Sequence, residues 1–392
     1  MSATHLCLTA RDGFFFKDGR GWSTSDGAHA GSHDWPFPTT LLGALRAQWG
    51  RHHEAARGAG TFTKHEWLRE TKDIALGATF PMRRTLGERW GMKHRMWPVP
   101  ADAVHLRDGV KRLDEWKSLA DEKIGSLGRS DDDARESLWF TTLGSPEKPV
   151  TAPRWWTEAQ MVAWLEGRAP NFKNVSLDAQ TMKRRTDIHL AIDPGTYSAF
   201  EGMLYAKDVV ETQGPNGEEW GIAMKAELPA TRHPGFAEGT WLLGGDSRAA
   251  HAEALEPGHF APPQNFGANV AKKAGGLRLI TVTPAHFADG WLPDGFSYRE
   301  GEYRGRLPGV AAEVTLLAAL VSRPVHTSGW DMEKGSPKRT LRLVAPGAVY
   351  FFAKSDRRSS FSAAEVGSLW LAAIGRDTHQ GLGRVVPGNW DL

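Results

Sequence analysis

The sequence predicts an α+β fold in two domains, on three observations. At 392 residues the chain exceeds the usual size of one compact domain. Stretches with alternating apolar residues outnumber helical patterns in both halves. Strands and helices do not follow the βαβ rhythm of a doubly wound sheet. The expected domains are residues 1–255 and 256–392, because EPGHFAPPQNFG at residues 256–267 has the Pro- and Gly-rich composition of a linker.

The expected N-terminal domain starts with a strand at residues 4–10, where HLCLTA alternates before an RDG turn. WPFPTTLLGALRAQWG predicts a helix that Thr39 or Thr40 caps and Gly50 ends. Strand patterns return in DIHLAI, where Ile188, Leu190 and Ile192 share one face, and then in SAFEGMLYA, EEWGIAMKAEL and GTWLLGGDSR.

Residues 99–174 are charged and dotted with Trp, and they carry little strand pattern. They predict a largely helical insertion in the N-terminal domain. Within it, TEAQMVAWLEG has the capping-box spacing of Thr157 and Gln160 and predicts a helix that ends at Gly167. Two fates stay open for Trp155, Trp156 and Trp164: a partner surface, or the commoner one of helix core.

The expected C-terminal domain has strand patterns in LRLITVTP, EVTLLAALV, RTLRLVAP and AVYFFA. SAAEVGSLWLAAIG predicts a helix with a capping box of Ser362 and Glu365 and an end at Gly375. A Gly-rich loop in RDTHQGLGRVVPGNWDL then leads into a last strand.

Composition limits the possible partners and the compartment. With 48 Lys and Arg against 46 Asp and Glu, the chain has no overall basic field, so a nucleic-acid site must be a local patch. Cys7 is the single cysteine, which excludes disulfides within the chain and CxxC metal sites. The sequence has neither a signal-peptide pattern nor an apolar run of membrane-spanning length, so we expect a cytoplasmic protein with no membrane partner.

Two segments resemble common catalytic motifs, but each lacks one required residue. HEWLR has Arg69 where a zinc protease has its second His, and GGDS has Ser247 where palm polymerases have a second acid. No phosphate-binding P-loop occurs. We therefore expect no cofactor and no metal. His189 or His5 could act as a general base in metal-independent RNA cleavage, although both lie between apolar strand residues.

Arg recurs beside Gly turns, in DGR at 18–20, GGDSR at 244–248, GR at 375–376 and GLGR at 381–384. Glycine lets a backbone approach a phosphate closely, and Arg supplies a forked donor. The same pairs also occur in ordinary solvated loops. The pattern alone leaves nucleic-acid binding and simple turns both open.

Five segments, in this order, resemble the third-subunit family of the Cmr effector complexes of type III-B CRISPR systems, within the RAMP superfamily. They are RDGFFFKDGRGW, WPFPTTLLGALR, RTDIHLAIDPGTYSAFEGMLYAKD, LLGGDSR and THQGLGRVVPGNW. The resemblance implies two ferredoxin-like, RRM-related domains and a noncatalytic subunit that holds the 5′ repeat-derived tag of the crRNA and caps the complex. It also implies contacts with the large polymerase-like subunit and with a backbone RAMP subunit.

On this interpretation the candidate RNA contacts lie in or beside the quoted motifs. They are Arg11, Lys17, Arg20, Arg46, Arg248, His379, Gly381, Gly383 and Arg384. In the first motif Phe14 and Phe16 should face one side and Phe15 the other, so the aromatics would anchor the loop. SRPVHTSGWDMEKGSPKRT at residues 322–340 is a candidate projecting hairpin, or an ordinary surface loop.

Two alternatives remain at this stage. One is a RAMP endoribonuclease that processes precursor crRNA with His189 or His5. The other is a carbohydrate-binding or carbohydrate-hydrolysing protein, because 17 Trp residues suit sugar binding as well as base stacking.

Overall fold

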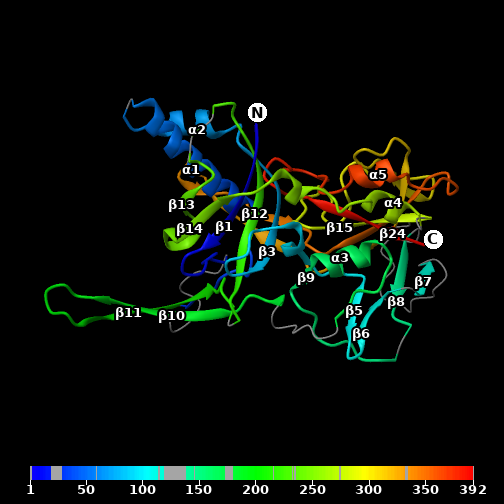
Figure 1. Cartoon of the computed structure of the whole chain (residues 1–392), viewed down its shortest axis with the longest axis horizontal. Helices are drawn as coiled ribbons and strands as arrows, with labels where there is room; N and C mark the ends of the chain where they lie inside the picture. Colours follow the sequence, from blue (N-terminus) through cyan, green and yellow to red (C-terminus); the bar gives the residue numbers. More distant parts are fainter. Residues whose placement is uncertain are drawn as a thin grey trace. The chain divides into compact units, whose positions relative to one another are not determined.

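The computed structural model describes residues 2–18, 29–58, 60–113, 115–118, 138–144, 146–172, 180–214, 216–231, 233, 235–272, 275–331 and 334–391. These residues form many strands and few helices, so the predicted α+β class is confirmed (Figure 1). Among them, no helix has both the length and the apolar character needed to cross a membrane.

The chain divides into two compact units that interleave along the sequence. Unit 1 comprises Met1–Trp90, Thr181–Pro257 and Thr327–Thr340, and unit 2 comprises Gly91–Gln180, Gly258–His326 and Leu341–Leu392. The segment expected as an insertion in the N-terminal domain therefore groups with unit 2. Asp102 explains this grouping in part, because it forms an ion pair with Arg278, and both side chains are fully buried.

Unit 1 is built on a five-stranded antiparallel sheet in the order β13-β14-β1-β12-β3. Its core contains alternate residues of the central strands, such as Leu6 opposite Met224. The strands are β1 (Ser2–Ala10), β3 (Ala75–Thr85), β12 (Glu218–Leu228), β13 (Gly239–Leu242) and β14 (Ala249–Ala254).

Helix α1 (Pro38–Arg57) packs its apolar stripe of Leu41, Leu42, Leu45 and Trp49 into this core, as predicted. Its N-cap is Phe37, and the expected caps Thr39 and Thr40 lie inside the helix. The expected end at Gly50 is wrong, since the helix continues to Arg57 and Gly58 caps it with a φ of 61°. Gly50 serves packing instead: a Cβ on it would lie 2.0 Å from Cζ3 of Trp67.

Trp67 lies in α2 (Lys64–Thr71), a helix that the sequence analysis did not predict. Thr63 and Glu66 form a complete capping box at its start. This is the same Thr-x-x-Glu/Gln spacing that correctly predicted the start of α3.

A long two-stranded ribbon extends beyond this sheet within unit 1. It consists of β10 (Arg184–Ile192) and β11 (Ala199–Val210), drawn in green in Figure 1, with their turn at the far end. At its base, the short β2 (His29–Ala30) pairs in parallel with β11. Unit 1 also contains a small hairpin of β20 (Trp330–Asp331) and β21 (Ser336–Pro337).

Unit 2 is built on a six-stranded antiparallel sheet in the order β16-β17-β18-β23-β15-β24. The strands are β15 (Gly276–Thr281), β16 (Ser297–Arg299), β17 (Glu302–Gly305), β18 (Val314–Leu320), β23 (Val349–Lys354) and β24 (Val385–Trp390). Helix α4 (Phe266–Ala271) packs against α5 (Ala363–Ser368). Helix α5 begins at the predicted Ser362 capping box, but it ends at Ser368, before the expected Gly375.

The rest of unit 2 corrects the expectation of a largely helical insertion. In its described part, residues 99–174 contain more strands than helices, and α3 (Glu158–Leu165) is the single α-helix there. The short strands are β4 (Met96–Pro98), β5 (Ala103–Leu106), β6 (Gly109–Arg112), β7 (Glu115–Ser118), β8 (Trp139–Thr142) and β9 (Trp155–Thr157), with β19 (Val325–Thr327) and β22 (Leu341–Leu343) elsewhere. Hairpin pairs such as β5–β6 form here because cross-strand partners lie within a few residues.

The three tryptophans whose fate the sequence left open are core residues, the commoner of the two expected fates. Trp155, Trp156 and Trp164 are at most 4% exposed. The indole of Trp156 donates to Nε2 of His105 at 3.1 Å, and that of Trp164 donates to Oδ1 of Asp102 at 3.0 Å. These bonds satisfy the polar edges of buried rings.

Both main sheets contain four neighbouring strands with the same connectivity. When these four are numbered along the chain, their order across the sheet is 4-1-3-2. They are β14-β1-β12-β3 in unit 1 and β24-β15-β23-β18 in unit 2. A βαββαβ unit has two crossover helices. Among the described residues, α1 occupies the first crossover in unit 1 and α5 occupies the second in unit 2. The ferredoxin-like assignment of each half stays a prediction.

Candidate nucleic-acid interface

The first motif, RDGFFFK, lies along the base of the β10–β11 ribbon. Phe14 and Val210 exchange two backbone hydrogen bonds, of 2.9 and 2.8 Å. Gly13 makes the approach possible, because it has a φ of 70° and a Cβ there would lie 2.6 Å from a methyl of Val209. Contacts within the protein alone therefore hold the motif against β11.

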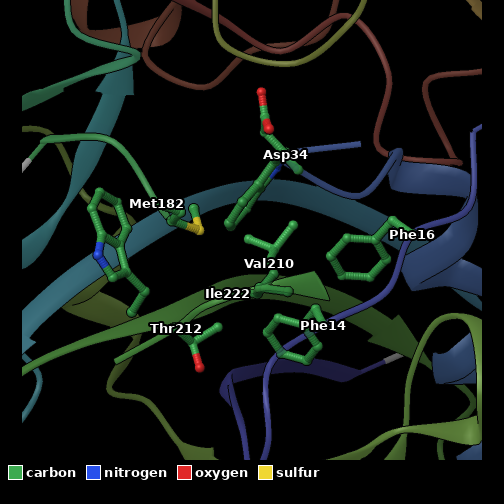
Figure 2. Close-up of a pocket in the computed structure, with 10 residues that line it drawn as sticks. Phe14, Phe16, Asp34, Met182, Val210, Thr212 and Ile222 are labelled. Atoms are coloured by element: carbon green, nitrogen blue, oxygen red, sulfur yellow. The ribbon is translucent and has the colours of Figure 1, made fainter. Parts of the chain in front are cut away.

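The three phenylalanines anchor this segment from both sides, as the alternation predicts. Phe14 and Phe16 stack with ring centroids 5.3 Å apart and line a small apolar cavity beside Val210 and Ile222 (Figure 2). Phe15 faces the other way, where it contacts the backbone of Gly245. All three rings are at most 5% exposed, so they are structural side chains.

The GGDS turn packs on the same segment. Gly245 donates its backbone N–H to the carbonyl oxygen of Phe15 at 2.7 Å. A Cβ on Gly244 would lie 2.5 Å from that oxygen, so only glycine fits there. The carboxylate of Asp246 pairs with Lys207 of β11, whose side chain is 6% exposed. The turn thus joins the first motif to the ribbon.

An ion-pair network completes the junction. Arg248 donates to the carbonyl oxygen of Asp12 at 2.5 Å and to the Asp187 carboxylate at 3.1 Å. Arg185 donates to Asp12 at 3.0 Å, to Asp187 at 2.7 Å and to Glu211 at 2.6 Å. The hydrogen bonds from Arg185 and then Arg248 hold the pKa of Asp187 below its usual value. Three motifs distant in sequence therefore meet at the ribbon base.

The predicted contacts in these motifs have different surroundings. Arg248 is 12% exposed and bonds to protein groups, so its guanidinium positions the Asp12 loop. Arg11 and Lys17 are exposed on the first motif, and Arg11 forms no ion pair with any residue that the structure describes. Arg20 lies outside the described residues.

Arg46 of α1 has a local structural task. Its Nη2 donates to the carbonyl oxygens of Lys72 at 3.0 Å and Ile74 at 3.2 Å. Both carbonyls lie in the connection between α2 and β3, and burial lowers the pKa of the guanidinium. Arg46 therefore fixes the backbone of that connection against α1.

The predicted Gly-rich loop belongs to unit 2 and is tied to its own fold. Gly381 and Gly383 are both buried, and a Cβ on Gly383 would lie 1.9 Å from the carbonyl oxygen of Ile374. Gly381 accepts a hydrogen bond from the hydroxyl of Thr283 at 2.8 Å. Of the two readings left open, the geometry matches glycines that turn the chain. His379 is exposed, and Arg384 donates to the carbonyl oxygen of Thr378 at 3.1 Å.

The ribbon itself carries a feature that the sequence analysis missed. Its large apolar side chains are exposed to solvent. Between residues 188 and 206 the charged residues are Asp193 and Glu201, with no Lys or Arg. The exposed fractions are 72% for Ile188, 49% for Leu190, 57% for Ile192, 85% for Tyr197, 47% for Phe200, 55% for Met203 and 58% for Leu204.

The two candidate general bases are not brought into one site. His189 stacks on Tyr205 across the ribbon, with centroids 5.1 Å apart, and its buried Nε2 forms no hydrogen bond with a residue that the structure describes. His5 lies on β1, opposite Lys225. Within the described ranges, no three His, Cys, Asp or Glu side chains form a group that could hold a metal ion.

The chain was compared with curated proteins and with solved structures. None of the curated proteins matches the chain by sequence. A subunit in the cryo-EM structure of the type III-B Cmr-β complex bound to cognate target RNA and AMPPnP is 13% identical, with 88% of this chain and 86% of that chain covered and a TM-score of 0.42. A chain of the crystallised Csm3–Csm4 subcomplex of a type III-A CRISPR–Cas complex is 8% identical, with coverages of 99% and 100% and a TM-score of 0.36.

The family model of the CRISPR-associated protein Cas_Cmr3 matches residues 6–390, which is nearly the whole chain. The match spans all five motifs that the sequence analysis quoted, including the three that meet at the ribbon base. The chain therefore belongs to the Cas_Cmr3 family and is a subunit of a type III-B CRISPR complex.

Proposed function

We propose that the chain is a noncatalytic RNA-binding subunit that holds the 5′ repeat-derived tag of the crRNA and caps the type III-B assembly. The observation that carries this proposal is the junction at the ribbon base. There the first motif, the ribbon strands and the GGDSR turn are held together by buried phenylalanines and by Arg248. Such rigid support keeps a binding loop in a fixed position.

In this proposal the first motif supplies the electrostatic contact. Arg11 and Lys17 are exposed on a segment whose backbone is anchored on both sides, and Arg20 follows in the same motif. Single-stranded RNA presents phosphates to such side chains and unstacked bases to apolar or aromatic ones. Local basic side chains suffice here, which agrees with a chain of nearly balanced charge.

The ribbon is proposed as the element that meets the rest of the complex. An isolated two-stranded ribbon with solvent-exposed apolar side chains is only marginally stable in water. The backbone RAMP subunit and the large polymerase-like subunit are the proposed protein partners. In this role the ribbon, rather than residues 322–340, is the better candidate for the projecting hairpin that separates tag from guide.

Binding to a fluorescent RNA that carries the repeat-derived tag tests the proposal. Substituting Arg11 by Ala should weaken binding about ten-fold, because a charge-assisted contact is lost. It should also reduce the slope of log Kd against log salt by about 0.7. Arg107→Ala, an exposed arginine of unit 2, is the matched control and should change neither quantity. An RNA without the tag should bind more weakly.

The same incubations separate the proposal from the endoribonuclease alternative. A noncatalytic subunit leaves a repeat RNA at full length over hours, whereas a RAMP nuclease shortens it. Cleavage that disappears in His189→Ala would overturn the noncatalytic assignment. Equal affinity for tagged and untagged RNA would overturn the tag assignment.

A further inference from the structure

Hydrogen bonds join the described residues of the β20–β21 hairpin of unit 1. Lys338 donates its N–H to the carbonyl oxygen of Gly329 at 2.7 Å, and Gly335 donates to that of Asp331 at 2.8 Å. The side chain of Asp331 accepts the N–H of Lys334 at 3.0 Å. The hydroxyl of Ser328 donates to the carbonyl oxygen of Lys338 at 2.8 Å. These bonds fix the two strands of the hairpin against each other.

Trp330 on this hairpin is unusual in its exposure. Its side chain is 56% exposed, whereas every other tryptophan that the structure describes is buried or half-buried. An indole in water costs free energy that a stacking partner would recover. No other large apolar residue of residues 327–340 in the described part is exposed.

Three basic residues lie on the second strand of the hairpin and beside it. Lys334, Lys338 and Arg339 are all exposed, and none forms an ion pair with a described residue. This differs from the ribbon base, where Arg185 and Arg248 are fully engaged by carboxylates. A Cβ on Gly329 would lie 3.7 Å from Cδ of Lys338, so the lysine stem lies against the residue that precedes Trp330.

We propose that the two strands of the β20–β21 hairpin and the residues beside them, 328–331 and 334–339, are a second contact for single-stranded RNA, separate from the tag site. Trp330 stacks on one base, and Lys334, Lys338 and Arg339 meet the neighbouring phosphates. The inference deepens the RNA-binding function proposed above and rests on it for the identity of the nucleic acid.

Two features favour RNA over a protein partner. A stable protein interface buries about 800 Å² on each side, and one exposed indole on a short hairpin offers far less apolar area. One aromatic ring among cations is the usual pattern of single-strand binding, in which each base has a face to stack and each phosphate has a charge. Duplex RNA would not fit, because its base faces are already stacked.

The test uses the full chain and a fluorescent twelve-nucleotide oligouridine that carries no tag. Trp330→Ala should weaken its binding five-fold or more, since stacking on an aromatic is worth about 1–3 kcal/mol per base. Trp330→Phe retains a stacking face and should stay within about two-fold. Leu86→Ala removes a side chain that is 62% exposed elsewhere in unit 1 and should have no effect.

Charge reversal tests the phosphate contacts. The double variant Lys334→Glu, Lys338→Glu should reduce the slope of log Kd against log salt by about 1.4, or about 0.7 for each lost contact. Lys148→Glu reverses an exposed lysine of unit 2 that forms no ion pair with a described residue, and it should leave the slope unchanged. Equal urea unfolding midpoints for all variants show that differences in binding are not differences in folding.

The outcomes distinguish this inference from the proposed function. Unchanged oligouridine affinity in Trp330→Ala overturns the inference, even when the tagged RNA still binds through Arg11. Loss of oligouridine binding in Trp330→Ala, with no preference for tagged RNA in the wild type, supports the inference and overturns the tag assignment. If Trp330→Ala binds both RNAs normally but loses a protein subunit on purification of the complex, the hairpin is a protein contact and the inference is wrong.

Discussion

Arg11 and Arg248 show how one residue type beside a turn serves two purposes. Both flank short turns in the sequence, and both were predicted to contact RNA. Arg248 donates a hydrogen bond to the carbonyl oxygen of Asp12, a residue 236 positions away along the chain. Arg11 remains exposed. Sequence patterns do not reveal such a distant ion-pair partner, so the structural arginine could not be separated from the exposed one.

Glycine has the same ambiguity at residue scale. Gly244, Gly245 and Gly383 all lie in motifs that suggested close approach of a phosphate. In each, the atom that excludes a Cβ belongs to the protein: Phe15 for the first two and Ile374 for the third. The need for glycine was predictable from the turn, but the identity of the approaching group was not.

His105 leads to a prediction on pH. Burial lowers its pKa from 6.5 to about 4, and its Nε2 accepts the indole N–H of Trp156. Because the folded pKa is depressed, the unfolded chain binds more protons between these two values. The contribution of His105 to stability is therefore complete above pH 6.5 and decreases as the pH falls toward 4.

Urea unfolding at pH 7 and pH 4.5 checks this prediction. His105→Gln keeps an acceptor for Trp156 but cannot titrate, so its unfolding midpoint should fall less than that of the wild type between the two values. His326→Gln, at an exposed histidine of unit 2, is the control and should follow the wild type. Identical pH dependence in wild type and His105→Gln would contradict the assignment.

At the scale of elements, α1 contains two glycines with opposite surroundings. A Cβ on Gly43 meets nothing within 4 Å, whereas one on Gly50 would collide with the ring of Trp67. Gly43→Ala should therefore stabilise the chain by up to about 1 kcal/mol through helix propensity. Gly50→Ala should destabilise it by about 1–3 kcal/mol, because overpacking outweighs that gain. Chemical unfolding of both variants measures the difference, and equal effects would exclude a packing role for Gly50.

Capping boxes were the most informative local signal for helices. Thr157 and Ser362 correctly predicted the starts of α3 and α5, and Thr63 with Glu66 would have predicted α2 in the same way. Ends were less predictable, as α1 and α5 show, because tertiary packing decides where a helix stops. The ribbon strands were predicted, but alternation of apolar residues does not tell whether the apolar face meets a core or solvent.

For the whole molecule, the α+β class followed from composition and periodicity, but the division of the chain did not. The expected boundary at residues 255 and 256 lies close to the junction of two segments at Pro257, yet residues 91–180 group with the C-terminal unit. Contacts such as Asp102 with Arg278 and Leu165 with Gly388 contribute to this grouping. These contacts join residues more than 170 positions apart, which local sequence patterns do not record.

The grouping predicts how fragments behave. Residues 256–392 expressed alone lack Asp102 and α3, so the fully buried Arg278 loses its partner, at a cost of about 3–5 kcal/mol. We expect this fragment to be insoluble or to lack a cooperative unfolding transition. A fused fragment of residues 91–180 and 256–392 should recover one. Circular dichroism on heating compares them, and a stable, cooperative 256–392 fragment would contradict the grouping.

The exposed ribbon has a consequence for the life of the protein in the cell. A chain that presents Ile188, Leu190 and Leu204 to water offers chaperones and proteases a surface that they recognise in any unfinished protein. Before assembly, the subunit would therefore be short-lived, and its abundance would follow that of its partners. The amount of this subunit would then match that of its partners without separate control of its synthesis, since any unassembled surplus would be degraded.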